Sequence, residues 1–398
     1  MKRKLYKKLL EEKDSKKISI IIGPRQVGKT TLLKQLHDKL GGLYVDFDIL
    51  ENVEKFDTYT KFIDSLKLEG YNEKKKFFLF IDEFQKYTDL TKILKNVYDN
   101  HKNIKIYATG SSSITIKNKI QESLSGRKIL HILYPLDFEE FLEFKKIDSA
   151  KLSKVQEFKG TLPKAIFKKE IEEFMQYGGY PEVVLSKNKI EILASIFDTF
   201  IKKDLVDYLN ISEIIGIKKL IQFLSINNGG KLNITDMIQQ LNLKREKIES
   251  YLEVLEETFI IKRVTPFYIN KNKEITKAYK EYFIDPGVRN YYCNNFNEMN
   301  LRNDVGFLFE TFILGEILKN SNYELKYWQD KQKHEVDFIV DKIHEQIGIE
   351  VKFKEKLKHE DYTGLKYIEN NVKKCFIINL IQQDEKHKLP FSIKNIII

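Results

Sequence analysis

The segment 23–30 constrains the fold of this chain more than any other stretch of it. Its residues, Gly-Pro-Arg-Gln-Val-Gly-Lys-Thr, match the pattern G-x-x-x-x-G-K-[ST]. An apolar run at 18–22 precedes the pattern, and an amphipathic stretch at 30–40 follows it. A glycine-containing loop between a strand and a helix can curl so that its backbone N–H groups point at phosphate oxygens. The pattern therefore predicts an ATP-binding loop in an α/β fold, and a turn that binds nothing is the alternative.

Individual residues of this loop have expected roles. Lys29 would reach the β- and γ-phosphates of ATP, and the Thr30 hydroxyl would bind Mg²⁺. The residues expected to contact the nucleotide are Gly23, Pro24, Arg25, Gln26, Val27, Gly28, Lys29, Thr30 and Thr31.

A second apolar run, 77–81, ends in two acids, Asp82 and Glu83. Ligands of α/β proteins bind at the carboxyl ends of the strands, so these acids would lie beside the phosphates. Asp82 would hold Mg²⁺ through water, and Glu83 would orient and deprotonate the water that attacks the γ-phosphate. Taken alone, two acids after a strand are equally typical of a solvated loop.

Two further positions are candidates for the same site. The predicted strand 104–109 runs into a serine-rich turn, where a hydroxyl can touch the γ-phosphate or the attacking water. We assign this role to Ser111, with Ser112 as the alternative and a helix cap as the structural interpretation. Arg127 is either an arginine finger that acts on a neighbouring subunit or one half of a structural ion pair.

The first third of the chain alternates β-branched runs with helical stretches, which is typical of a parallel α/β sheet. Its predicted strands cover 18–22, 43–47, 77–81, 104–109 and 128–133. The pattern is then helical to about residue 227, with amphipathic stretches at 138–144, 166–177 and 189–209, and α/β alternation returns after about residue 296. We therefore predict an ATPase domain at 1–150, a helical lid at 151–228, a winged helix at 229–292 and a C-terminal α/β domain at 293–398.

The third of these parts has the pattern of a winged helix. Helices are predicted at 234–241 and 245–259, and the run that begins at residue 260 would form the wing. Cations on its outer face could contact DNA phosphates, namely Lys244, Arg245, Lys247 and Lys262. The second helix also carries acids that repel a phosphate backbone, namely Glu246, Glu249, Glu253, Glu256 and Glu257. A packing module between domains is therefore the favoured interpretation.

The last part contains two runs with a period of two, 334–340 and 348–353. The period places one apolar set on a single face of the first strand: Val336, Phe338 and Val340. Asp337, Glu350 and Lys352 then share the opposite face of an antiparallel hairpin. Two carboxylates on neighbouring strands can bind Mg²⁺ or Mn²⁺, and a nearby lysine can activate water or hold a phosphate. The alternative is a salt-bridge cluster without catalytic activity.

Over most of its length the sequence resembles the prokaryotic, largely archaeal AAA-type ATPases whose C-terminal half is an uncharacterised domain ending in a PD-(D/E)xK nuclease-like module. The stretches that carry the resemblance are, in order, 23–30, 80–85, 109–112, 125–127, 134–136, 138–141, 178–181 and 283–290. The resemblance implies an ATPase whose C-terminal domain has a fold of the restriction-endonuclease type.

The same resemblance implies a role for Glu310. In nucleases of this type a helix ahead of the sheet commonly supplies a metal-binding glutamate, and Glu310 stands at the matching position of the apolar stretch 306–314. An acid among apolar neighbours is costly unless it is paired or binds a metal. The metal ligands implied at this centre are Glu310, Asp337 and Glu350. Val336 stands where the family pattern has proline.

Composition limits the setting in which the protein works. The formal net charge of +10 favours an anionic partner, but only seven of the 68 basic residues are arginine, the better reader of phosphate and guanine. Cys293 and Cys375 form neither a disulfide framework nor a metal-spaced pair. The start of the chain lacks the apolar stretch of a signal peptide, and the longest apolar runs are too short to cross a membrane. We expect a soluble, cytoplasmic protein.

Together these patterns predict a Mg²⁺-dependent ATPase that acts on DNA through a metal-dependent nuclease centre. Its expected catalytic residues are Lys29, Glu83, Ser111 and Arg127 for ATP, and Asp337, Glu350 and Lys352 for DNA. The alternatives are a nucleotide-dependent switch or DNA-binding regulator with an inactive nuclease fold, and a protein-remodelling ATPase. Expected cofactors are ATP and Mg²⁺, with Mg²⁺ or Mn²⁺ at the second centre. DNA and further copies of the chain are candidate partners.

Overall fold

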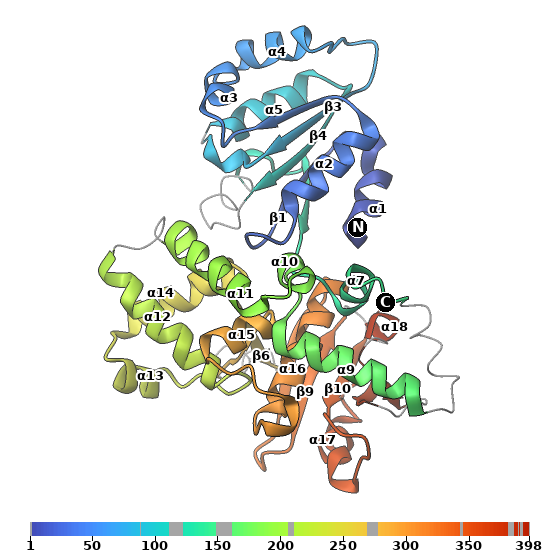
Figure 1. Ribbon diagram of the computed structural model, residues 1–398, viewed down its shortest axis with the longest axis vertical. Helices are drawn as coiled ribbons and strands as arrows, with labels where there is room; N and C mark the ends of the chain where they lie inside the picture. Colours follow the sequence, from blue (N-terminus) through green and yellow to red (C-terminus); the bar gives the residue numbers. More distant parts are fainter. Residues whose placement is uncertain are drawn as a thin grey trace. The chain divides into compact units, whose positions relative to one another are not determined.

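The computed structural model describes residues 2–87, 89–110, 122–148, 161–205, 211–268, 278–342, 345–380, 386–388, 390 and 393–397. The chain divides into two units, Met1–Pro135 and Leu136–Ile398, and Figure 1 colours them from blue to red along the sequence. None of the helices in the described ranges is long and apolar enough to cross a membrane.

A parallel five-stranded sheet forms the centre of the first unit. Its strands are β1 (Ile18–Ile22), β2 (Leu43–Asp46), β3 (Phe77–Asp82), β4 (Ile104–Gly110) and β5 (Lys128–Ile132), in the order β2-β3-β4-β1-β5. Every neighbouring pair is parallel. β1 and β4 are buried at each of their residues, as expected for parallel strands covered by helices on both faces. The prediction of a parallel α/β sheet in this part of the chain is therefore confirmed.

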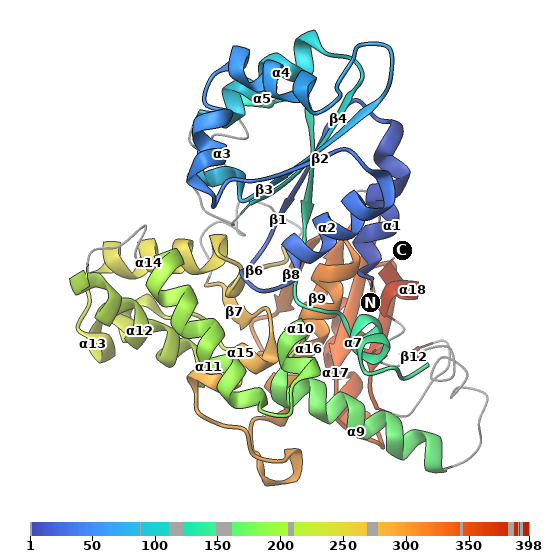
Figure 2. The ribbon, with the colours of Figure 1, turned by 45° about the horizontal axis from the view of Figure 1, so that its top comes forward.

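The helices of the first unit lie on both sides of this sheet. They are α1 (Lys4–Glu11), η1 (Glu12–Asp14), α2 (Lys29–Leu40), α3 (Leu50–Lys55), α4 (Tyr59–Leu68), η2 (Phe84–Lys86) and α5 (Leu90–Asn100). Figure 2 shows α3, α4 and α5 together on one side, and α1 and α2 on the other. Because all five strands run in the same direction, the loops after β1 and β3 emerge at the same edge of the sheet.

A seven-stranded mixed sheet forms the centre of the second unit. Its strands are β6 (Ile261–Pro266), β7 (Lys280–Phe283), β8 (Glu324–Gln329), β9 (Glu335–Asp341), β10 (Gln346–Val351), β11 (Lys374–Ile378) and β12 (His387–Lys388), in the order β12-β11-β10-β9-β8-β6-β7. β9 and β10 form the predicted antiparallel hairpin. β6, the predicted wing strand, pairs with β8 at Thr265 and Pro266. Strands from the third and fourth predicted parts of the chain thus share one sheet.

Helices surround this sheet and extend from it. They are α7 (Phe138–Phe144), α9 (Thr161–Tyr177), α10 (Pro181–Leu185), α11 (Lys189–Thr199), η4 (Phe200–Leu205), α12 (Ile211–Ile226), α13 (Ile234–Leu241), α14 (Arg245–Glu257), α15 (Pro286–Tyr292), η6 (Met299–Leu301), α16 (Val305–Asn320), η7 (His359–Tyr362), α17 (Thr363–Ile368) and α18 (Ile393–Ile397). The helix predicted at 189–209 ends as an α-helix at Thr199 and continues as a π-helical turn.

α16 is the central helix of the second unit, and its middle residues are buried around almost the whole circumference. The ring of Phe312 contacts the rings of Phe138 on α7, at 5.6 Å between centroids, and Phe174 on α9, at 5.2 Å. The same apolar cluster continues to β9, β10 and α18. One core therefore joins α7, from the end of the predicted ATPase domain, and α9, from the predicted lid, to the C-terminal sheet.

A β-bulge interrupts the pairing of β8 with β9. Lys326 lies opposite Ile339, but Trp328, two residues on, lies opposite Val336, so β9 carries one extra residue. Phe338 therefore packs in the α16 cluster, whereas Val336 packs on the other side of the sheet with α17. The prediction that Val336 shares a face with Phe338 was wrong, because a bulge reverses the alternation of side chains beyond it.

Asp285 holds together two turns that are distant in the sequence. Its carboxylate caps α15 by accepting hydrogen bonds from the backbone N–H of Gly287, at 2.9 Å, and Val288, at 3.2 Å. It also accepts one from the N–H of Gly179, at 2.8 Å, in the turn that ends α9. A Cβ on Gly287 would lie 2.1 Å from the carbonyl oxygen of Tyr177, so the two turns pack too closely for a side chain there.

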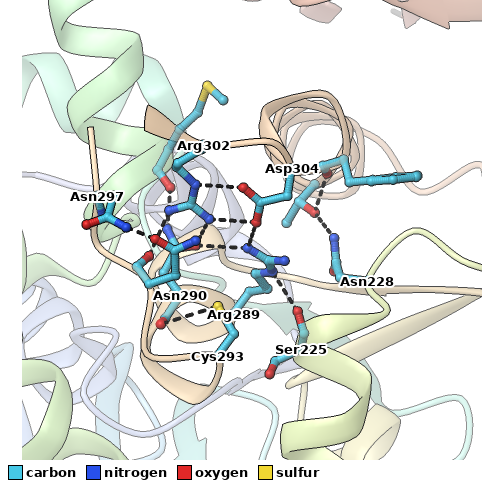
Figure 3. A network of polar contacts seen from close by, with 12 residues as sticks. Ser225, Asn228, Arg289, Asn290, Cys293, Asn297, Arg302 and Asp304 are labelled. Carbon is cyan, nitrogen blue, oxygen red and sulfur yellow. Dashed lines mark hydrogen bonds and ion pairs between the residues drawn. The ribbon is translucent and has the colours of Figure 1, made fainter. Parts of the chain in front are cut away.

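A buried polar network connects α12, α15 and the start of α16 (Figure 3). The Arg302 guanidinium donates two hydrogen bonds to Asp304, each 2.8 Å long, and Arg289 forms an ion pair with the same carboxylate. Arg289 also donates to the carbonyl oxygen of Ser225 at 2.7 Å, and Arg302 to the Asn290 side chain at 2.9 Å. Two of the few arginines in the chain therefore serve the internal structure of this unit.

Candidate functional site

The predicted nucleotide-binding loop lies between β1 and α2. Gly23 packs so closely on β5 that a Cβ there would lie 2.1 Å from the carbonyl oxygen of Leu133. Gly28, which precedes α2, has a φ of 92°, a conformation that favours glycine. The two glycines of the pattern are thus required by the shape of the loop. α2 begins at Lys29, and Thr30 and Thr31 lie in its first turn, where backbone N–H groups are available to an anion.

Lys29 is nearly buried and folds back over the loop. Its ammonium donates hydrogen bonds to the carbonyl oxygens of Gly23, at 2.9 Å, and Pro24, at 2.7 Å. Arg3 links the loop to the segment after β5, because its guanidinium donates hydrogen bonds to the carbonyl oxygens of Val27, at 2.7 Å, and Tyr134, at 2.8 Å. The sequence pattern gave no sign of the part that Arg3 plays, since it stands 24 residues before Val27.

Asp82 ends β3 and is buried. One of its oxygens accepts a hydrogen bond from the Tyr44 hydroxyl of β2 at 2.7 Å, and the other accepts one from the Thr109 hydroxyl of β4. Hydroxyls from the strands on either side therefore hold the carboxylate at the edge of the sheet where the loop emerges. Tyr44 and Thr109 were missed in the sequence, although both stand within predicted strands and Thr109 is the last residue of its strand.

Glu83 follows Asp82 with a left-handed backbone, at a φ of 52°. The Gln85 amide donates a hydrogen bond to its carboxylate. Burial raises the pKa of Glu83 above that of an ordinary glutamate, against the opposing effect of the Lys29 charge. A carboxylate of this kind, close to the charge of Lys29, suits a general base.

Ser111 and Arg127 are the two remaining candidates for the first site. Ser111 and its alternative Ser112 lie outside the described residues. Arg127 forms a bidentate pair with Asp99 of α5, at 2.8 and 3.0 Å. Its carbonyl oxygen accepts from the N–H of Ile18, at the amino end of β1, whereas the loop follows the carboxyl end. Arg127 is therefore not brought to the nucleotide loop of its own chain.

Asp337, Glu350 and Lys352 come together at one end of the β9–β10 hairpin. The Lys352 ammonium forms an ion pair with Glu350 and lies 3.9 Å from the nearer Asp337 oxygen. Burial and the Asp337 charge raise the pKa of Glu350 well above its ordinary value. Burial alone would lower the pKa of Lys352, but the charges of Asp337 and Glu350 outweigh it and raise that pKa. The ammonium is therefore charged at neutral pH.

Glu310 projects from α16 toward the same acids. Its carboxylate accepts a hydrogen bond from the Tyr282 hydroxyl at 2.8 Å. Burial, followed by the Asp337 charge, raises the pKa of Glu310 to about 8. Near Tyr282, the buried Lys280 forms an ion pair with Glu335. Lys280 and Tyr282 were missed in the sequence, because β7 was assigned to the predicted winged helix. Glu335 was also missed, although it stands in the predicted strand 334–340.

The carboxylates of this second centre each have one oxygen held by a protein donor. Tyr282 holds Oε2 of Glu310, the Val351 backbone N–H holds Oδ2 of Asp337 at 2.8 Å, and Lys352 holds Oε1 of Glu350. The other oxygen of Glu350 is buried and has no hydrogen-bond partner within the described part of the structure. A buried carboxylate oxygen without a partner is costly, and a bound cation would satisfy it. The donor set therefore fits Mg²⁺ or Mn²⁺.

The side chains of the second centre are nevertheless not gathered closely enough to form a ready-made site. Across the described ranges, no group of three or more His, Cys, Asp or Glu side chains is placed to hold a metal ion as the side chains stand. A cation would therefore have to draw these carboxylates together.

The cations of the predicted winged helix are largely paired with acids. Arg245 contacts Glu249 at 3.1 Å, one turn along α14, and Lys262 contacts Glu256 at 2.8 Å. Lys247 forms an ion pair with Glu213. Because surface pairs of this kind offset the positive charge, this face offers little net attraction to a phosphate backbone.

Family comparisons match three segments of the chain. Residues 15–142 match the model of an AAA domain, which confirms the predicted P-loop ATPase-type domain. Residues 168–299 and 305–396 match two domains of unknown function, DUF8612 and DUF4143. The nuclease-like and winged-helix assignments therefore stay predictions.

Relatives occur in both archaea and bacteria. An uncharacterized protein of Methanocaldococcus jannaschii is 28% identical over 343 residues, which cover 81% of this chain and 72% of the relative. An uncharacterized protein of Haemophilus influenzae is 28% identical over 385 residues, which cover 93% and 90%. Among solved structures, a Walker-type ATPase of Pyrococcus abyssi aligns with a TM-score of 0.48 at 15% identity, over 72% of this chain and 94% of that one.

Proposed function

We propose that the chain binds ATP together with Mg²⁺ at the edge of the five-stranded sheet and hydrolyses the γ-phosphate. One observation supports the proposal: Lys29, Asp82 and Glu83 lie at the same edge of the sheet, beside a loop whose glycines are required by its shape. An acidic pair next to a phosphate-binding lysine is the arrangement that phosphoryl transfer to water needs.

In this proposal each residue has a separate task. The Lys29 ammonium exchanges its bonds with the loop carbonyls for bonds with the β- and γ-phosphates, and the first N–H groups of α2 bind the same phosphates. Thr30 and Asp82 would hold Mg²⁺, which neutralises charge on the phosphates. Glu83 accepts the proton of the attacking water, a task favoured by its raised pKa.

The proposal is tested by ATP binding and turnover with Lys29→Ala and Glu83→Gln. We expect Lys29→Ala to lose both, and Glu83→Gln to bind ATP while turnover falls by about a hundredfold or more. Lys39→Ala is a matched control, since this exposed lysine lies on the same helix about 15 Å further along. Turnover that is unchanged in both site variants would refute the assignment.

We propose metal-dependent cleavage of DNA as a second candidate function, located in the second unit. It is supported by the convergence of Glu310, Asp337, Glu350 and Lys352 and by the buried, unpartnered oxygen of Glu350. Asp337, Glu350 and Glu310 would hold Mg²⁺ or Mn²⁺, which activates water and polarises the scissile phosphate. Lys352 would hold a phosphate oxygen or orient that water.

This second candidate is tested with supercoiled, linear and branched DNA, with Mg²⁺ or Mn²⁺, and with or without ATP. Cleavage by the wild type that Asp337→Ala abolishes would support a nuclease, and Lys29→Ala would show whether ATP controls it. Absence of cleavage alongside measurable ATP hydrolysis would instead favour a nucleotide-dependent switch. Stimulation of hydrolysis by a protein, and not by DNA, would favour a remodelling ATPase.

A further inference from the structure

Two side chains of β7 contact the acidic cluster of the second unit, which consists of Glu310, Glu335, Asp337 and Glu350. β7 lies outside the segment that was predicted to form this centre. Lys280 and Tyr282 precede both the predicted nuclease-like part, 293–398, and the matched segment 305–396. They are 4% and 0% exposed, so each is fixed in the interior. Their position follows from the fold, because β7 forms a hairpin with β6, and β6 joins the C-terminal sheet through β8.

Tyr282 is held rigidly on both sides. Its backbone pairs with Lys262 of β6, and its ring packs against Phe338 of β9 at 5.5 Å between centroids. The hydroxyl donates to Oε2 of Glu310 at 2.8 Å. Glu310 is only partly exposed, and a glutamate side chain without a partner can adopt several rotamers. The tyrosine therefore limits the directions that the Glu310 carboxylate can take.

Lys280 acts on a different acid of the cluster. Its ammonium forms an ion pair with Glu335, whose other oxygen accepts a hydrogen bond from the Gln329 amide at 2.7 Å. Both oxygens of Glu335 are thus occupied by protein donors, whereas Oε2 of Glu350 has no hydrogen-bond partner among the described residues. When all four acids are ionised, Glu310, Glu335, Asp337 and Glu350 together carry two more charges than Lys280 and Lys352. One divalent cation would balance that difference.

We propose that β7 is part of a divalent-cation site in the second unit. In this site Tyr282 is a positioning residue that orients Glu310 toward the cation. Lys280 is a fixed counter-ion that holds the Glu335 carboxylate away from the cation. This inference rests on the metal-binding centre of the second candidate function. It adds that the centre is shared between β7, a strand of the predicted winged-helix part, and the strands of the predicted nuclease-like part. Donors that orient a metal-binding carboxylate contribute strongly to metal affinity.

The test measures Mn²⁺ binding to the intact chain in the absence of nucleotide, from the electron paramagnetic resonance signal of free Mn²⁺. The variants are Tyr282→Phe, Glu335→Gln, Asp337→Ala and Tyr327→Phe. We expect Asp337→Ala to abolish binding and Tyr282→Phe, which keeps the ring on Phe338, to weaken it by about tenfold or more. Glu335→Gln is expected to change the affinity by less than about threefold, since Glu335 is not a ligand in this proposal.

Tyr327→Phe is the matched control. It removes a hydroxyl that donates at 2.7 Å to the carbonyl oxygen of Ala278 in the same unit, and it should leave Mn²⁺ binding unchanged. The melting temperature measured without Mn²⁺ separates a structural role of Tyr282 from a positioning role. If the role were purely structural, Tyr282→Phe would lower the melting temperature and leave the Mn²⁺ affinity unaltered.

The outcomes distinguish this inference from the function on which it rests. A wild-type chain that binds no Mn²⁺ would remove the metal centre and the second candidate function with it. Wild-type binding that Tyr282→Phe leaves unchanged would overturn the role of β7 alone. A tenfold loss in Glu335→Gln would show that Glu335 is a ligand and would overturn the role of Lys280.

Discussion

Asp82 illustrates how much a single side chain depends on neighbours that a linear pattern does not reveal. Its carboxylate would be free to rotate at the end of a strand, but hydroxyls from the two adjacent strands hold both oxygens. The acid is thereby oriented before any ligand binds, which is the condition for strong electrostatic stabilisation in a site. Tyr44 and Thr109 are the groups that supply this orientation.

We predict that Thr109→Val lowers ATP turnover by about tenfold and leaves ATP affinity within about threefold. Valine keeps the volume but removes the donor to Asp82 and the acceptor, at 3.4 Å, of the Glu83 backbone N–H. Turnover and binding are measured separately, by steady-state kinetics and by titration. Tyr107→Phe is the control on the same strand, since its hydroxyl donates to the carbonyl oxygen of Leu9, away from the site. Equal kinetics for Thr109→Val and wild type would exclude the positioning role.

Asp304 gives a prediction for stability against pH. Burial alone would raise the pKa of this carboxyl, but Arg302 and Arg289 outweigh burial and lower the pKa to about 2. An unfolded aspartate titrates near 3.9. Since the folded pKa is the lower one, the contribution of Asp304 is complete above about pH 4 and is lost as the pH falls toward 2. The shift corresponds to about 2.6 kcal/mol at most, since solvent screens a partly exposed carboxyl.

Urea unfolding of the wild type and Asp304→Asn should therefore differ by a constant free energy from pH 7 to pH 5. The difference should narrow below about pH 4, as the wild type loses its advantage. A difference that stays the same at pH 3 would mean that the two arginines do not lower the pKa of Asp304 in the folded chain.

At the scale of elements, Asp285 connects a helix start to a distant turn. The carboxylate caps α15 and also accepts from Gly179, so its loss would leave three buried N–H groups without acceptors. We predict that Asp285→Ala lowers the free energy of unfolding by about 3 kcal/mol or more. The reason is that each unsatisfied buried donor retains its full desolvation cost.

An exposed helix cap provides the comparison for this prediction. Asn233 caps α13 through the N–H groups of Thr235 and Asp236, at 3.1 and 3.4 Å. We expect Asn233→Ala to cost about 1 kcal/mol, since water can replace its bonds. Denaturant unfolding of both variants measures the two losses of unfolding free energy. Equal costs would show that the link between α15 and the turn at Gly179 adds no stability.

At the scale of the whole molecule, the two units each have their own sheet and their own buried core. The two proposed ligands would bind to different units, ATP to the first and a divalent cation to the second. A ligand stabilises the part of the chain that binds it, by about 2.7 kcal/mol when its concentration is a hundred times its dissociation constant.

We therefore predict two transitions in scanning calorimetry. Mg²⁺ with ATP should raise the midpoint of one, and Lys29→Ala should abolish that shift. Mn²⁺ without nucleotide should raise the midpoint of the second transition, and Asp337→Ala should abolish that rise. A single transition that responds to both ligands would show that the chain unfolds as one cooperative body.

Local patterns were enough to predict part of the molecule. The nucleotide-binding loop, the strands of the five-stranded sheet and the β9–β10 hairpin could be predicted because each depends on residues that are neighbours in the sequence. A loop before a helix, an apolar run and a period of two are all properties of short segments. The positions of Lys29, Asp82 and Glu83 at one edge then follow from the parallel direction of the strands.

Other features were decided by tertiary structure alone. The bulge in β9 depends on the pairing with β8, and it moves Val336 to the opposite face from Phe338. Tyr282 meets Glu310, 28 residues away, because β6 joins the C-terminal sheet. Pairings of this kind depend on the packing of many distant side chains at once, and no short stretch of sequence contains that information. The sequence by itself therefore determined which groups could carry chemistry, and the tertiary structure decided which of them meet.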